Sequence, residues 1–344
     1  MWNSKLRIAV FSTGLTLLAT GLPAVAQEAQ WPAVPPEAAP ADWGPVSLNF
    51  EEITYPYAVQ YLELTRFGQK IRMAYMDIPP TGPANGQTVF WQHGHNFYSE
   101  AYTTSFKALS DAGFRVLAVD RVGYGKSSKP LIPYNFNFEA ANMKALLDEK
   151  GLESVAIVGH SMGGMVVSRF ALHYPEVVTH VVMVNQIGLT DQRLSRPWSD
   201  PYGSDPGVST YESILRGHQI YFTDFWPPAH LEYVRRAYGQ TLSGDYHHYA
   251  MVRRMVGQMM YDDPVVYDWQ HIKNKALVMG GEDDKLVDDF VGLATNVHNQ
   301  LQNSALLLYP DVGHAPQIEI PDQFHADLIR FLKSDPSEPA SEWR

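Results

Sequence analysis

Residues 159–163, Gly159-His160-Ser161-Met162-Gly163, join a buried strand to a helix in a single turn. The apolar run Ser154–Val158 leads into this pentapeptide, and a helix is expected over Met162–His173. A turn this sharp pushes its middle side chain out of the sheet in a strained conformation, so the residues two positions away must be nearly free of side chain. Gly159 and Gly163 meet that need. The pattern G-x-S-x-G in this context makes Ser161 a candidate nucleophile.

Two later strand ends carry the base and the orienting acid that a nucleophilic serine requires. The strand expected at Ala276–Met279 ends in Gly280-Gly281 and is followed by the carboxylates Glu282-Asp283-Asp284. The strand expected at Ala305–Tyr309 is followed by His314, which stands out among the histidines for its place at a strand end. We predict His314 as the general base. Only one of the three carboxylates can face its imidazole, and we choose Asp284 first and Asp283 second.

A serine nucleophile also needs two backbone N–H groups to hold the oxyanion of the reacting carbonyl. One is expected from Met162, directly after the nucleophile. The other is expected from His95, in the loop after the short strand Thr88–Gln92. The side chains of His93 and His95 have the spacing of a metal pair, which is the alternative interpretation of this loop. No third metal ligand lies nearby in the sequence, so we predict no metal.

Apolar strands alternate with helices of ten to fifteen residues over most of the chain, which predicts a mostly parallel sheet covered on both faces. The runs Val59–Thr65 and Lys70–Ile78 alternate apolar and polar residues and suit an antiparallel pair at one edge, turning at Gly68-Gln69. In such sheets chemistry lies at the carboxyl ends of the strands, and every motif named above falls at such an end.

These segments resemble the α/β-hydrolase superfamily, and specifically its capped members with a serine nucleophile. The matching segments are His93-Gly94-His95-Asn96, Asp120–Ser127, Gly159–Gly164, Gly281–Asp284 and Gly313-His314. The resemblance implies a central sheet flanked by helices, with a helical cap after the sixth strand, a triad in the order Ser161, Asp284, His314, and no cofactor. Epoxide hydrolases and haloalkane dehalogenases of this superfamily use an aspartate nucleophile, and Ser161 in that position argues against both activities.

The predicted cap, residues 189–271, interrupts the alternation and is rich in aromatic residues. We expect it to cover the sheet edge and to line an apolar pocket, with Phe222, Phe225 and Trp226 facing the substrate. The core is expected over residues 55–188 and 272–333.

Both ends of the chain are expected to lie outside this fold. Residues 1–26 read as a signal peptide, because Lys5 and Arg7 precede an apolar run that ends at Ala24-Val25-Ala26. Residues 27–54 form a Pro-rich lead-in that we expect to be extended and solvated, and the tail 334–344 is expected to fray. The sequence thus predicts a periplasmic or secreted protein that leaves the membrane once the signal is removed.

Composition narrows the function further. The 344 residues carry 26 Lys and Arg against 37 Asp and Glu, a formal net charge of -11, which disfavours a nucleic-acid partner. Cysteine is absent, which excludes disulfides and a cysteine nucleophile. The sequence does not predict an oligomeric state.

We expect a serine hydrolase that cleaves a small or medium carboxylic ester or lactone through an acyl-enzyme. Three alternatives stay open. One is a carbon–carbon bond hydrolase. Another is an aminopeptidase that would hold the substrate amine with Glu232 or Asp245. The third is a catalytically idle member that binds a ligand.

Overall fold

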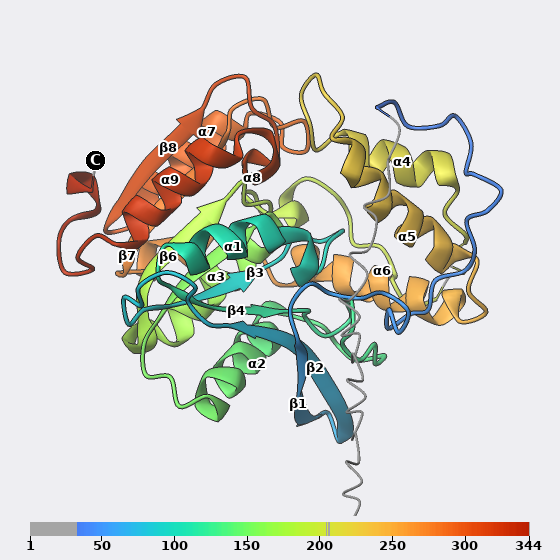
Figure 1. Ribbon diagram of the computed structural model, residues 1–344, viewed down its shortest axis with the longest axis horizontal. Coiled ribbons are helices and arrows are strands. Elements are labelled where there is room, and N and C mark those ends of the chain that lie inside the picture. The colour runs from blue at the N-terminus through green and yellow to red at the C-terminus, as the bar shows by residue number, and fades with distance from the viewer. Residues whose placement is uncertain (1–32, 204, 206, 344) are drawn as a thin grey trace, which may run out of the picture. The chain divides into compact units, whose positions relative to one another are not determined.

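The computed structural model describes residues 33–203, 205 and 207–343, and these residues are organised around one twisted sheet (Figure 1). Its strands are β1 (Val59–Arg66), β2 (Gln69–Ile78), β3 (Thr88–Gln92), β4 (Arg115–Val119), β5 (Val155–His160), β6 (Val178–Val184), β7 (Lys275–Gly281) and β8 (Ser304–Tyr309), in the spatial order β1-β2-β4-β3-β5-β6-β7-β8. The pairs β1–β2 and β2–β4 are antiparallel, and all later neighbours are parallel. The predicted mostly parallel sheet is confirmed.

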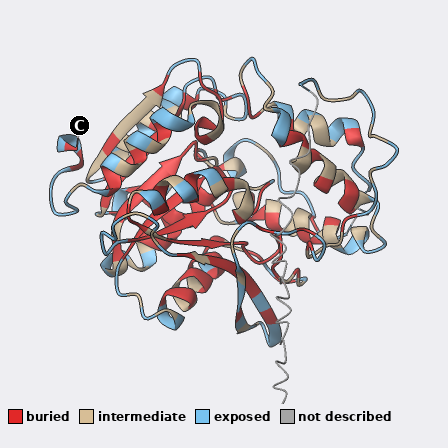
Figure 2. Cartoon of the chain, viewed as in Figure 1, coloured by how far each residue is buried: buried red, intermediate tan, exposed pale blue. Residues whose placement is uncertain are grey.

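Burial follows the position of each strand in the sheet. Every residue of β3, β5 and β7 is buried, as expected for strands covered on both faces, whereas in β1 at the edge only Leu62 is buried (Figure 2). The hairpin between β1 and β2 turns at Phe67-Gly68, one residue earlier than predicted. Both residues take positive φ angles, 49° and 72°, as a two-residue hairpin loop with the twist of its strands requires.

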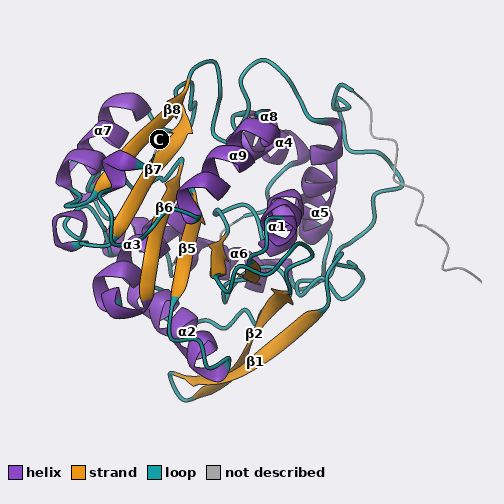
Figure 3. Ribbon diagram, turned by 60° about the vertical axis from the view of Figure 1, so that its left-hand side comes forward, coloured by secondary structure: helices purple, strands orange, loops and turns teal. Residues whose placement is uncertain are grey.

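Helices cover both faces of the sheet, in two separate apolar layers (Figure 3). The core helices are α1 (Thr103–Asp111), α2 (Phe136–Glu149), α3 (Met162–His173), α7 (Phe290–Gln300), α8 (Pro316–Glu319) and α9 (Pro321–Leu332). Buried side chains of α2, α3 and α7 belong to one cluster, and those of α1 and α9 belong to the other. This arrangement leaves the carboxyl ends of the parallel strands open to the segment that follows β6.

That segment forms α4 (Tyr211–Gln219), α5 (Leu231–Thr241) and α6 (Tyr246–Asp262) between β6 and β7. We call residues 189–271, the segment predicted as a cap, the lid. Val252, Val256 and Met259 of α6 are buried in the same apolar cluster as α2 and α3, so the lid packs on the core through an apolar helix face.

The predicted lead-in is only partly solvated. The Val46 N–H donates to the Gly239 carbonyl of α5 at 2.9 Å, and the Tyr211 hydroxyl donates to the Pro36 carbonyl at 2.7 Å. Val46 and Phe50 are buried. The composition of this segment did not reveal its packing. Three apolar residues near its end, Val46, Phe50 and Ile53, are buried in the core, and such long-range contacts cannot be recognised in the local sequence.

The expectation that the C-terminal tail frays is wrong for its described part. Ala340 is fully buried, and its N–H donates to the Asn303 side chain at 2.7 Å. The Trp343 ring packs edge-on against Phe331 of α9, with ring centroids 5.6 Å apart. The burial of one large aromatic ring outweighs the polar and Pro-containing composition on which the expectation rested.

The predicted signal peptide, residues 1–26, lies outside the described residues. Within the part of the chain that is described, no helix combines the length and apolarity needed to cross a bilayer.

Candidate active site

Ser161 occupies the turn between β5 and α3, where its backbone is strained. Its φ of 57° and ψ of -123° are rarely adopted by a residue with a side chain. The surrounding structure holds this conformation. The Ser161 N–H donates to the Val184 carbonyl of β6, and its carbonyl accepts from the Gly164 N–H, both at 2.9 Å. The serine is therefore fixed at the carboxyl ends of β5 and β6.

The two glycines of the motif are required by contacts as well as by the turn. A Cβ at Gly159 would lie 2.2 Å from the Gly163 carbonyl oxygen, and a Cβ at Gly163 would lie 2.3 Å from the Gln92 carbonyl oxygen of β3. Backbone atoms cannot move aside as the end of a side chain can. The pentapeptide therefore fits between β3 and α3 only with glycine at both positions.

His314 and Asp284 form a buried pair beside this turn. His314 Nδ1 lies 2.7 Å from Asp284 Oδ2, and neither side chain is exposed. The same carboxylate accepts hydrogen bonds from the Asn185 side-chain amide and the Leu286 N–H, both at 2.9 Å. Burial by itself would raise the pKa of Asp284, but His314 and these donors hold that pKa below its ordinary value. The ionised carboxylate can only accept, so His314 carries a proton on Nδ1, which leaves Nε2 as the nitrogen that could act as a base.

Of the three adjacent carboxylates, Asp284 is the one that contacts the histidine, while Glu282 and Asp283 are exposed. Asn185, which the sequence analysis missed, holds the Asp284 loop from β6. Its side-chain oxygen accepts from the Gly281 N–H at 3.0 Å while its amide donates to Asp284. The available sequence indication was an amide side chain placed directly after a buried strand.

Ser161 lies on a loop beside His314. Among the hydrogen bonds of the described residues, none joins the Ser161 hydroxyl to the His314 imidazole. The ring of His160, its neighbour in sequence, lies 4.9 Å from the His314 ring. His314 Nε2 is buried and has no hydrogen-bond partner among the described residues. The structure thus brings Asp284 and His314 into direct contact and leaves the second imidazole nitrogen available at this site.

The predicted oxyanion loop lies directly against Ser161. A Cβ at Gly94 would lie 3.1 Å from Ser161 Cβ, so the glycine allows this close approach. The N–H groups of His95 and Met162 form no hydrogen bonds within the described residues. Met162 is the first residue of α3, where N–H groups have no partner within the helix. Both predicted donors are therefore available to a bound oxygen.

A hydrogen-bond relay that the sequence analysis missed connects the oxyanion loop to the histidine loop. The Gly94 N–H donates to the Tyr102 hydroxyl at 2.9 Å, and that hydroxyl lies 2.7 Å from His160 Nδ1. His160 Nε2 lies 2.7 Å from the His314 carbonyl, which can only accept. Burial lowers the pKa of His160 to about 3, so its ring is neutral. Nε2 therefore carries the proton, and Nδ1 accepts from the Tyr102 hydroxyl.

His93 and His95 are both engaged within the protein. His93 Nδ1 lies 2.7 Å from the Gly94 carbonyl, and His93 Nε2 accepts from the Arg121 N–H at 3.1 Å. His95 Nδ1 lies 3.0 Å from the Tyr124 hydroxyl. Both nitrogens of His93 are thus occupied, and it has none left to offer a metal ion. No cluster of three or more metal-ligating side chains was found in the described residues.

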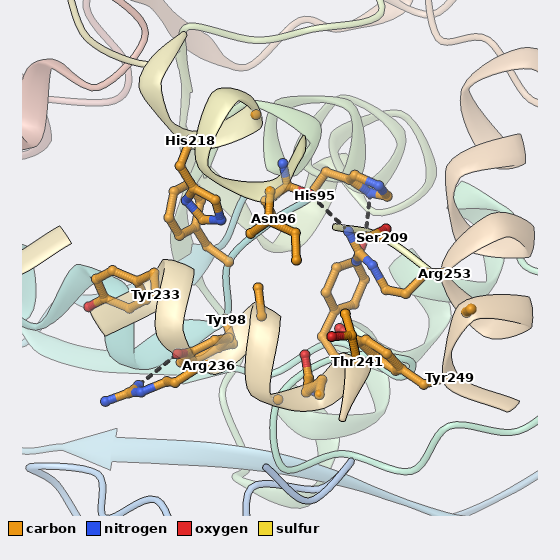
Figure 4. Close-up of a pocket in the computed structure, with 18 of the residues that line it drawn as sticks. His95, Asn96, Tyr98, Ser209, His218, Tyr233, Arg236, Thr241, Tyr249 and Arg253 are labelled. Atoms are coloured by element: carbon orange, nitrogen blue, oxygen red, sulfur yellow. Dashed lines mark hydrogen bonds between the residues drawn. The ribbon is translucent and has the colours of Figure 1, made fainter. Parts of the chain in front are cut away.

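A cavity of about 450 Å³ opens beside His95 and Asn96, with the lid residues Tyr233, Tyr249 and Arg253 in its wall (Figure 4). Ser161 is 3% exposed and is not part of this wall, whereas His95 and Asn96 of the predicted oxyanion loop are.

None of the three rings predicted to face the substrate, Phe222, Phe225 and Trp226, lines this cavity. They pack with one another instead, and the rings of Phe222 and Trp226 also contact His230. Aromatic density alone did not distinguish rings that hold the lid together from rings that line its inner face.

The acidic residues considered for binding a substrate amine lie elsewhere. Glu232 is paired with Arg235 and Arg236, at 2.6 Å in each case. Asp245 lines a separate surface groove together with His248. Neither residue lines the cavity beside the oxyanion loop.

Comparison with known proteins gives a consistent result. The family model for the alpha/beta hydrolase fold matches residues 87–321. A crystal structure of a probable hydrolytic enzyme from Pseudomonas aeruginosa PAO1 superposes with a TM-score of 0.80 at 33% identity, covering 85% of this chain and 99% of that one.

Two relatives with assigned activities are more distant or match over less of the chain. A 2-hydroxy-6-oxononadienedioate/2-hydroxy-6-oxononatrienedioate hydrolase from Paraburkholderia phymatum is 27% identical over 79% of this chain and 95% of its own. A haloalkane dehalogenase from Mycolicibacterium paratuberculosis is 32% identical, but the match spans 43% of this chain and only 49% of that enzyme. From the family match and the sheet topology together, the chain is a member of the alpha/beta hydrolase fold family.

Proposed function

We propose that the protein is a serine hydrolase that cleaves a small or medium carboxylic ester or lactone, with Ser161, His314 and Asp284 as its triad. The observation that carries the proposal is the buried His314–Asp284 pair, whose 2.7 Å contact fixes the imidazole and leaves Nε2 without a partner among the described residues. The hydrolase fold of the family and the 33% identical structure of a probable hydrolytic enzyme support the coarser assignment.

The proposed mechanism has two stages. His314 Nε2 takes the Ser161 proton as the oxygen attacks the carbonyl carbon, and the His95 and Met162 N–H groups receive the developing oxyanion. His314 then returns the proton to the leaving alcohol oxygen, the carbon–oxygen bond breaks, and the acyl group stays on Ser161. In the second stage His314 activates water, which releases the acid and restores the serine. Asp284 stabilises the imidazolium in both stages.

The residue at the nucleophile position separates this proposal from some relatives. A dehalogenase or epoxide hydrolase of this superfamily would need a carboxylate where Ser161 stands. A carbon–carbon bond hydrolase remains the second candidate, because the relative from Paraburkholderia phymatum has that kind of substrate and matches over most of both chains. The aminopeptidase alternative loses its support, since Glu232 and Asp245 do not line the cavity.

Labelling with a serine-directed fluorophosphonate tests the proposal. We expect the label on the wild-type chain and none on Ser161→Ala, and an aryl ester or lactone turned over only by the wild type. A matched control is Ser168→Ala on the same helix, whose hydroxyl donates to the Gly164 carbonyl and lies beneath the surface. Unlabelled wild-type protein would favour the idle ligand-binding alternative. Label without ester turnover would favour carbon–carbon bond hydrolysis.

We also propose that the chain is exported and that residues 1–26 are removed, on the basis of the cationic start, the apolar run and the Ala-x-Ala site. N-terminal sequencing of protein from the periplasm or medium tests this. A product that begins at Met1 would contradict it.

A further inference from the structure

The cavity beside the oxyanion loop has an unexpected charge. Its wall contains three arginines, Arg236, Arg253 and Arg254, and no described Asp or Glu. The whole chain carries a net charge of -11, so a cavity wall with cationic and no acidic side chains differs in charge from the chain as a whole. Arginines without acidic neighbours in a concave site are typical of anion recognition.

Arg236 is neutralised by the protein itself. Its guanidinium contacts Glu100 at 2.9 Å and Glu232 at 2.6 Å, and it also donates to the Tyr98 hydroxyl. Figure 4 shows it turned toward Tyr98. These two carboxylates leave it no net charge to offer a ligand.

Arg253 differs from Arg236 because no ion pair with a carboxylate forms at this residue in the described structure. Its guanidinium donates to the Asn96 side-chain oxygen at 3.0 Å and lies over the Tyr124 ring, 4.8 Å from the centroid. Figure 4 shows Arg253 and Asn96 facing each other on the same side of the cavity. A neutral amide and an aromatic face orient a guanidinium without cancelling its charge.

Arg253 also lies close to the proposed reaction centre. Its partner Asn96 is two residues from Gly94, which lies directly against Ser161. Two residues of chain span at most about 7 Å. The Asn96 amide in turn donates to the Tyr221 hydroxyl at 2.9 Å, and the Tyr221 carbonyl accepts from the His314 N–H at 2.9 Å. These contacts connect the guanidinium through Asn96 to the loops that hold Ser161 and His314.

We propose that Arg253 binds a carboxylate on the substrate, so that the preferred substrates are esters or lactones bearing a free acid group a few bonds from the reacting carbonyl. The ester or lactone part of this inference rests on the proposed function. The binding of an anion by Arg253 does not. The guanidinium would hold the carboxylate in a two-point contact, and the cavity of about 450 Å³ sets the size of the molecule. Arg253 is then a specificity-determining residue.

A binding experiment tests the site without turnover. In the Ser161→Ala chain, calorimetry compares monomethyl glutarate with the primary amide of the same monoester, which has nearly the same shape and no charge. We expect the acid to bind about 10- to 100-fold more tightly, as charged hydrogen bonds of this kind provide. Adding Arg253→Gln should remove that preference, and Arg253→Lys should keep part of it. Equal affinity of the two ligands, or a preference that survives Arg253→Gln, overturns the proposal.

The control is Arg216→Gln, which removes a lid cation of the same type outside the cavity. Arg216 lies on α4, largely exposed, 3.6 Å from Glu212. It should leave the preference unchanged, and a loss there would show that net charge rather than Arg253 selects the acid. If Arg253→Gln does not fold, the proposal is still tested by the affinities of the acid and the amide for the Ser161→Ala chain and for the same chain with Arg253→Lys.

Turnover separates this inference from the proposed function. The wild type should hydrolyse an aryl hemiglutarate with a higher kcat/KM than the aryl ester of the matching neutral acid. Turnover of both esters without that ratio refutes the inference and leaves the serine hydrolase standing. Tight binding of the acid without turnover of either ester supports the anion site and refutes the ester hydrolase.

Discussion

Replacing Tyr102 with Phe removes one oxygen atom from the relay that connects the oxyanion loop to the histidine loop. The Tyr102 hydroxyl accepts from the Gly94 N–H and donates to His160 Nδ1, at 2.9 and 2.7 Å. Both partners are buried, and the ring contact with Trp91 is kept in the variant. The change therefore leaves two buried polar groups without a partner and alters little else.

The magnitude follows from those two groups. A buried donor or acceptor without a partner costs about 1–3 kcal/mol, so Tyr102→Phe should lower the free energy of unfolding by about 2–6 kcal/mol. Loss of the hydroxyl also frees the Gly94 loop, whose position against Ser161 determines where the His95 N–H points. A shift of this kind should lower kcat/KM on an aryl ester by about 10- to 100-fold.

Urea denaturation followed by tryptophan fluorescence measures the first effect, and initial rates measure the second. Tyr134→Phe is the control, because the Tyr134 hydroxyl donates only to the Pro130 carbonyl at 2.8 Å and should cost about 1 kcal/mol with little effect on rate. A Tyr102→Phe variant with wild-type stability and wild-type rate would refute the assigned relay.

Three further predictions concern a buried acid, the triad and the turn. Burial raises the pKa of Glu139 from its ordinary 4.5 to about 7, so between these two pH values the unfolded chain loses this proton while the folded chain keeps it, and stability falls as the pH rises. Glu139→Gln should therefore raise the free energy of unfolding above about pH 7, by an amount on the order of a few kcal/mol, and leave it unchanged below pH 4.5. A pH dependence of unfolding identical to that of the wild type would count against this. Asp284→Asn should lower kcat by about 10³- to 10⁴-fold, while the exposed Asp283→Asn stays within a few-fold, and the reverse order in a rate assay would reassign the acid. Gly163→Ala places a methyl group 2.3 Å from a β3 carbonyl oxygen and should destabilise by about 1–3 kcal/mol or more, whereas Gly217→Ala in open space on α4 should be neutral or stabilising; equal melting temperatures for the two variants would contradict the steric argument.

Much of the core could be predicted because its determinants are local. Strand and helix periods place Ser161 at the end of β5 and His314 after β8, and the parallel topology brings such ends to one edge. The choice of Asp284 over its neighbours agrees with the observed contact to His314. Its burial among three donors could not be derived from the acidic run itself.

The supporting residues could not be predicted because their roles depend on partners far away in sequence. Asn185 and Asp284 are 99 positions apart, and Tyr102 and His160 are 58 apart. Nothing in the local pattern around Tyr102 distinguishes a hydroxyl in a relay from an ordinary core ring. The packing of Phe222, Phe225 and Trp226 with one another and of two of them with His230 is a further case, because composition does not indicate which partner a ring packs against.

The sequence by itself determined the sheet, the serine turn and the positions of Asp284 and His314 after two later strands, since backbone sterics and hydrophobic periodicity act over a few residues. The tertiary structure alone decided which lid side chains face the cavity, and that Arg253 rather than Arg236 keeps an uncompensated charge there. Those outcomes depend on distances across the fold, because electrostatic and hydrogen-bonding energies are set by the neighbours in space and not by the neighbours along the chain.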